Sequence, residues 1–88
     1  MKIVFNEIWN GAVPYVHDHM IDQIHDDNVE CERYTGITPS TLWLSYIIPK
    51  GYVTVSLNDD DWQITITTEH YDTYFTIPRK DVHNVSIF

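Results

Sequence analysis

The stretch LWLSYIIPKGYVTVSLNDDDWQITITT, residues 42 to 68, decides the fold class. Apolar and polar residues alternate in its segments, and a period of two is typical of strands that bury one face. Between the segments, PKG (49–51) and NDDD (58–61) are residues that favour tight turns. Short strands joined by tight turns predict an antiparallel meander.

The strand pattern continues on both sides of this stretch. Further strands are expected at 2–8, 29–34, 73–77 and 85–88. In VECERY (29–34), apolar residues alternate with two glutamates, and this pattern favours a solvated or edge strand.

One helix is expected between the strands 2–8 and 29–34, from about 13 to 27. Its apolar residues recur at helical spacing: Val13, Val16, Met20 and Ile24. Pro14 suits the first turn and Asn28 is a plausible end. The sequence therefore predicts an α+β fold: one amphipathic helix packed on an antiparallel meander sheet of five to seven short strands, in a single compact domain, 1–88.

The charge balance restricts the partners that the chain can bind. Thirteen acidic residues face five basic ones, which gives a formal net charge of −8. Direct binding to nucleic acid or to an anionic membrane needs a basic surface and is disfavoured. A basic protein partner is favoured instead, because the negative field would speed its approach.

The N-terminal sequence and the cysteine count favour a cytoplasmic setting, or the host cytoplasm if the protein is viral. MKIVFNEIWNG (1–11) has neither the apolar core of a signal peptide nor a membrane span. Cys31 is the sole cysteine, so an intrachain disulfide is impossible.

The segment HDHMIDQIHDD (17–27) raises the question of a metal site. Zinc sites on helices use histidines three or four residues apart, and His17, His19 and His25 do not have that spacing. Sets such as Asp18, Asp22 and His25 would hold a divalent ion only weakly. We expect no metal or cofactor, and we expect His17 to be half-buried and hydrogen-bonded to backbone.

The sequence contains no recognisable catalytic motif, and we expect no enzymatic activity. Cys31 lies between Glu30 and Glu32. Neighbouring anions discourage formation of a thiolate, so we expect Cys31 to be a small core residue.

Acidic residues form the candidate partner-binding surface. Asp18, Asp22 and Asp26 fall at i, i+4 and i+8, where like charges repel one another on a helix. Asp26 and Asp27 would also stand at the helix C-terminus, where the dipole disfavours anions. The predicted partner-binding set is Asp18, Asp22, Asp26, Asp27, Glu30, Glu32, Asp59, Asp60 and Asp61.

These features favour a small non-enzymatic binding protein. A row of carboxylates can imitate the phosphates of DNA, so the expected partner is a basic, nucleic-acid-handling protein or enzyme that the chain inhibits. Small acidic inhibitors of phage origin, which serve host-defence evasion, and immunity-type proteins are similar in size and charge, although no motif connects them with this chain.

Three alternatives remain at this point. The acidic residues could form a solvated face without a partner. The protein could be a structural or assembly subunit that uses a sheet edge or an aromatic and threonine-rich sheet face: Tyr52, Thr54, Gln63, Thr65 and Tyr74. It could also be a weak metal- or ligand-binding module that uses the histidines and aspartates of 17–27. With any of these functions, the chain could be a monomer or a homodimer.

Overall fold

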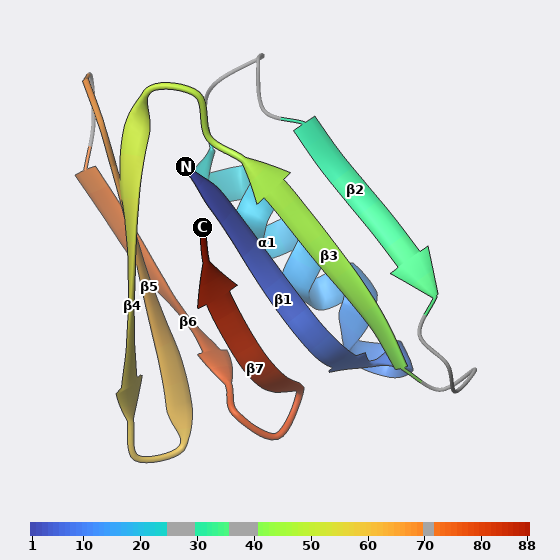
Figure 1. The fold of residues 1–88 in the computed structure, drawn as a ribbon. Coiled ribbons are helices and arrows are strands. Elements are labelled where there is room, and N and C mark those ends of the chain that lie inside the picture. The colour runs from blue at the N-terminus through green and yellow to red at the C-terminus, as the bar shows by residue number, and fades with distance from the viewer. Residues whose placement is uncertain (25–29, 36–40, 70–71) are drawn as a thin grey trace.

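The computed structural model describes residues 1–24, 30–35, 41–69 and 72–88. The elements are β1 (Lys2–Trp9), a 3-10 turn η1 (Asn10–Ala12), α1 (Val13–Gln23), β2 (Glu30–Thr35), β3 (Thr41–Ile47), β4 (Gly51–Asn58), β5 (Asp61–Thr68), β6 (Asp72–Pro78) and β7 (Val82–Ile87). Within the described residues, one short helix and seven antiparallel strands confirm the α+β class (Figure 1).

The strands form two sheets, so the prediction of a single meander sheet was wrong. One sheet has the order β2-β3-β1-β7, and the other has the order β4-β5-β6. The second sheet is a meander, but in the first the N-terminal strand lies between β3 and the C-terminal strand. Alternation in a sequence shows which face of a strand is buried, and it does not show which strand is its neighbour.

The helix begins at Val13 as expected and ends at Gln23, four residues before the predicted end. Ile24 has an extended backbone, with φ −97° and ψ 104°, and is buried. Its apolar side chain therefore reaches the core from outside the helix. Helical spacing alone counted Ile24 as a helical residue and so placed the end of the helix about one turn too far along the chain. The expected end at Asn28 lies outside the described residues.

The two sheets and the helix enclose one core. Figure 1 shows α1 behind β1 and β3, and the three-stranded sheet beside β7. Thr73 Oγ1 on β6 donates a hydrogen bond of 2.6 Å to Gln23 Oε1, which ties the end of the helix to the second sheet. The core consists of Ile3, Phe5, Ile8, Ala12, Val13, Val16, Met20, Ile24, Leu42, Leu44, Tyr46, Ile48, Val53, Ile64, Ile66, Phe75, Ile77 and Val82.

The alternation in residues 42–68 predicts three inward-facing rows: Leu42, Leu44, Tyr46 and Ile48; Val53, Val55 and Leu57; and Trp62, Ile64 and Ile66. The first row agrees with the core, the third agrees except that Trp62 is only partly buried, and the second agrees only in part. Leu42, Leu44, Tyr46 and Ile48 are all buried. In β4, Val53 is buried, Val55 is half-buried and Leu57 is exposed, because the end of the β4–β5 hairpin extends beyond the core. No helix within the described ranges is long and apolar enough to cross a membrane.

A bulge in β1 brings a third apolar residue onto its buried face. The register between β1 and β3 shifts between Phe5 and Ile8, and Glu7 has a φ of 55°. An extra residue in one strand moves the following side chains to the other face. Ile8 therefore joins Ile3 and Phe5 in the core, although strict alternation would place it outside.

We expect Trp62→Phe to lower the free energy of unfolding by about 1–2 kcal/mol, because it removes a hydrogen bond between the two sheets. The Trp62 indole N–H on β5 donates to the carbonyl of Val82 on β7 at 2.8 Å. Urea unfolding measures the loss. The matched control is Trp9→Phe at a side chain that is 59% exposed, with an expected change within about 0.5 kcal/mol. Equal changes in the two variants would contradict a role for the indole bond.

Candidate functional site

The outward face of α1 carries two of the predicted partner-binding residues. Asp18 and Asp22 lie one helical turn apart and are both exposed, while Val16 and Met20 on the opposite side are buried. We call Asp18 and Asp22 the acidic helix face. Asp26 and Asp27, which were expected to continue it, lie outside the described residues, as do His25 and His70.

Glu30 and Glu32 do not extend the acidic helix face. They stand on the edge strand β2, opposite Ile47 and Ser45 of β3. Successive side chains of a strand point to opposite faces, and the helix packs on the face that carries Leu44 and Tyr46. The two glutamates therefore lie on the outer face of this sheet, away from the helix.

The third acidic group lies in the β4–β5 turn, as its composition predicted. Asp59, Asp60 and Asp61 are all exposed, and Asp59 has a left-handed φ of 46°. Asp60 and Asp61 border a hollow of about 770 Å³ together with Arg79, Lys80 and His83. The backbone N–H of Arg79 donates to the Asp60 carbonyl at 2.8 Å. Two cationic side chains thus offset the negative charge of this turn locally.

A second feature of α1 faces the first sheet. His17 is half-buried, as expected, but its Nδ1 shares a hydrogen bond of 2.8 Å with the hydroxyl of Tyr46 and not with backbone. Tyr46 is fully buried and makes an edge-on ring contact with Phe5. Burial raises the pKa of the Tyr46 phenol well above its ordinary value, and Cys31 and Asp18 add to this shift.

Cys31 is exposed, so the prediction that it is a core residue was wrong. It stands opposite Tyr46, on the sheet face that the helix covers, and strand alternation assigned it to that face. Nevertheless β2 is the edge strand, and Figure 1 shows it beyond the helix. The helix therefore leaves the thiol open to solvent, with its sulfur 3.9 Å from His17 Nδ1.

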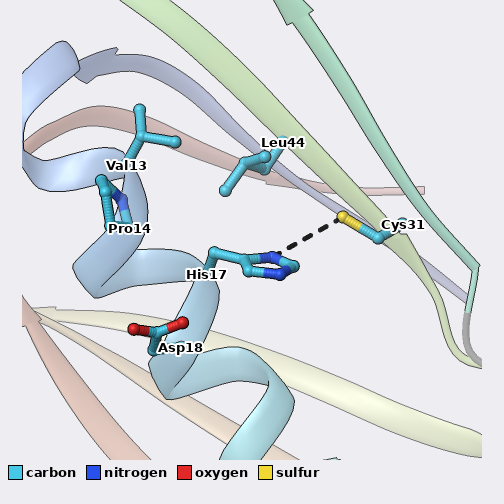
Figure 2. A pocket seen from close by; sticks show the side chains of 6 residues that line it. All are labelled: Val13, Pro14, His17, Asp18, Cys31 and Leu44. Carbon is cyan, nitrogen blue, oxygen red and sulfur yellow. Dashed lines mark hydrogen bonds between the residues drawn. The ribbon is translucent and has the colours of Figure 1, made fainter.

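A pocket separates the helix from β2 and β3 at this point. Its volume is about 420 Å³, and it is lined by Val13, Pro14, His17, Asp18, Cys31 and Leu44. Figure 2 shows the His17 ring pointing from the helix toward the sulfur of Cys31. We call this hollow the His17 pocket. It combines a thiol, an imidazole and a carboxylate with apolar walls, and the imidazole is hydrogen-bonded to the buried phenol of Tyr46.

The other helix histidine does not contribute to this pocket. The Nδ1–H of His19 donates to the backbone carbonyl of Tyr15 at 3.1 Å, and its ring stacks at a tilt on that of Tyr15. Within the described ranges, no three His, Cys, Asp or Glu side chains stand close enough to hold a metal ion. That the chain needs no metal stays a prediction.

The reasoning from sequence missed the cluster of His17, Tyr46 and Cys31. One signal was present, because Tyr46 falls in the apolar row of its strand and a buried phenol needs a hydrogen-bond partner. His17 was expected to be half-buried, and a half-buried imidazole could be that partner.

Comparison of the chain with protein-family models, curated proteins and solved structures gave no match.

We expect the buried phenol to make the protein less stable at high pH. Unfolded Tyr46 ionises near pH 10, whereas burial keeps the folded residue protonated. Its contribution is therefore present below about pH 10 and is lost as the pH rises toward the folded pKa. Between about pH 10 and 11, the unfolding free energy of Tyr46→Phe should fall less steeply than that of wild type, by up to about 1.4 kcal/mol per pH unit.

Urea unfolding at several values between about pH 9 and 11 tests this expectation. Tyr74→Phe is the control, because Tyr74 is 68% exposed and should keep the wild-type slope. If wild type and Tyr46→Phe lose stability in parallel, the phenol does not determine the alkaline response.

Proposed function

We propose that this protein is a non-enzymatic binding protein that inhibits a basic, nucleic-acid-handling protein by occupying its nucleic-acid site. The observation that carries the proposal is the acidic helix face. The sequence of α1, VPYVHDHMIDQ, contains no lysine or arginine beside its two exposed aspartates. The carboxylates therefore present negative charge that the helix itself does not neutralise.

The position of these charges supports binding better than it supports folding. Like charges four residues apart cost a helix a few tenths of a kcal/mol, and no basic side chain follows in the last turn. The buried side of the helix, with Val13, Val16 and Met20, fixes the backbone on the core. A rigid scaffold that holds anionic groups suits a basic groove, because little order has to be gained on binding.

Of the three acidic groups, the helix face is the best contact surface. The turn Asp59–Asp61 lies beside Arg79 and Lys80, and Glu30 and Glu32 face a different direction. The partner would be bound in the cytoplasm, or in the host cytoplasm if the protein is viral.

Competition with nucleic acid tests the proposal. The chain is immobilised, its partner is captured from extract of the native host cell, and the purified partner is titrated with the chain and with DNA or RNA. We expect the chain and the nucleic acid to exclude each other, with an association rate that falls as salt is raised. Simultaneous binding of both would contradict mimicry.

A second candidate function is assembly through the outer face of the three-stranded sheet. Tyr52 and Tyr74 are 70% and 68% exposed, and both lie on this face with threonines of β5 between them. Large exposed aromatic side chains are typical of protein contacts. If assembly is the function, Tyr52→Ser with Tyr74→Ser should convert a concentration-dependent oligomer into a monomer in sedimentation experiments.

A further inference from the structure

We propose that Cys31 is a reactive thiol, and that the His17 pocket directs it toward small, positively charged disulfides, which leave a mixed disulfide on its sulfur. This site adjoins the acidic helix face and shares Asp18 with it, but its reaction does not depend on a protein partner. It rests on the position of Cys31 and His17 in one pocket (Figure 2) and on the hydrogen bond between His17 and Tyr46.

Cys31 has the access and the neighbour that a nucleophilic thiol needs. The thiolate is the reactive form, and an adjacent imidazole favours it through an N–H hydrogen bond or a positive charge. Cys31 is exposed, and its sulfur lies 3.9 Å from His17 Nδ1. The glutamates on either side of it in the sequence project from the opposite face of β2, so of these acidic residues only Asp18 borders the pocket with the sulfur.

Tyr46 holds the imidazole in place. Its hydroxyl is 2.8 Å from His17 Nδ1, and the two rings lie nearly parallel, at 23°, with centroids 6.1 Å apart. Because Tyr46 is fully buried, its position is fixed by the core. Burial also raises the pKa of the phenol, so Tyr46 remains a neutral partner and adds no negative charge beside the thiol.

The pocket determines which reagent fits. Its volume of about 420 Å³ is within the range of small-molecule sites. Val13, Pro14 and Leu44 supply apolar walls for short methylene chains, and Asp18 supplies a negative charge. The net charge of −8 acts in the same direction. A disulfide with short aliphatic arms and terminal ammonium groups matches this lining, and cystamine is the probe.

The reaction is thiol–disulfide exchange. The Cys31 thiol gives its proton to solvent, and the thiolate, which faces His17 Nδ1, attacks one sulfur of the small disulfide. A bond forms between Cys31 Sγ and that sulfur, and the original disulfide bond breaks. The other half leaves as a thiolate and takes up a proton from solvent. Cys31 is thereby oxidised to a mixed disulfide, and half of the small disulfide is reduced to a free thiol.

The first experiment measures the reaction rate by intact-protein mass spectrometry. Folded and urea-unfolded protein are each treated with cystamine, with neutral bis(2-hydroxyethyl) disulfide and with anionic glutathione disulfide. We expect folded Cys31 to react with cystamine at least about tenfold faster than unfolded Cys31 does. We also expect the ratio of the cystamine rate to the glutathione disulfide rate to be higher for the folded protein than for the unfolded chain. Equal rates, or equal preferences, in the two states would overturn the proposal.

Matched variants assign the effect to the pocket. His17→Gln should slow the cystamine reaction of the folded protein by about tenfold or more, whereas His19→Gln should not. Asp18→Asn should reduce the preference for cystamine by about two- to fourfold, and Asp22→Asn, with the same net charge, should not. Cys31→Ser should give no adduct.

Each variant is checked for cooperative unfolding before its rate is measured. Equal rates for His17→Gln and His19→Gln would show that Cys31 is an ordinary surface thiol. If His17→Gln fails to fold, the comparison of Asp18→Asn with Asp22→Asn still decides whether the pocket selects the reagent.

Discussion

Phe5→Ala is expected to lower the free energy of unfolding by about 3–5 kcal/mol, the largest change of any substitution considered for this protein. Phe5 is fully buried in β1, between β3 and β7, and its ring meets Tyr46 edge-on at a centroid distance of 6.1 Å. Truncation removes buried apolar surface and leaves a cavity that the flanking strands cannot close. A domain of this size has a total stability of about 4–13 kcal/mol, so the variant should be close to unfolding.

Urea unfolding followed by tryptophan fluorescence measures the loss. The control is Tyr74→Ala, which removes an aromatic ring that is 68% exposed and should change stability by no more than about 0.5 kcal/mol. If Phe5→Ala does not fold, Phe5→Leu keeps most of the volume and should cost less than about 1.5 kcal/mol. A small loss in Phe5→Ala would show that β1 is not the centre of the core.

Asp18→Lys with Asp22→Lys is expected to weaken partner binding at least tenfold while leaving the fold intact. Both side chains are exposed, and neither is part of the core, so stability should change little. In the best-measured case, close interfacial charge pairs contribute about 1.5–7 kcal/mol, and a tenfold loss corresponds to about 1.4 kcal/mol. Part of the loss should appear in the association rate, and it should shrink as salt is raised.

The matched control is Asp60→Lys with Asp61→Lys, which changes the net charge from −8 to −4, as does the helix variant. Asp60 and Asp61 are exposed beside Arg79 and Lys80. A loss confined to the helix variant would locate the contact on α1. Equal losses would indicate that overall charge governs binding, and no loss in either variant would contradict the proposed function.

The sequence by itself determined the local features of this protein. Alternation placed Leu42, Leu44 and Tyr46 of β3, and Ile48 directly after it, on one buried face, and helical spacing located the start of α1 at Val13. Turn residues separated β4 from β5, and the glutamates of β2 indicated an edge strand. These features depend on the repeat of one segment and on the preference of short turns, both of which are local properties of the chain.

Only the tertiary structure decided which segments meet. Strand pairing put β1 in the middle of the first sheet and separated β4, β5 and β6 into a second one, since a strand with one apolar face can pair with several partners. The pairing of β2 with β3 put Cys31 beside Tyr46, and the packing of α1 on this sheet added His17. His17 is 29 residues from Tyr46 and 14 residues from Cys31 along the chain. Cys31 is open because the helix, which is shorter than its spacing predicted, covers β1 and β3 and leaves the edge strand uncovered.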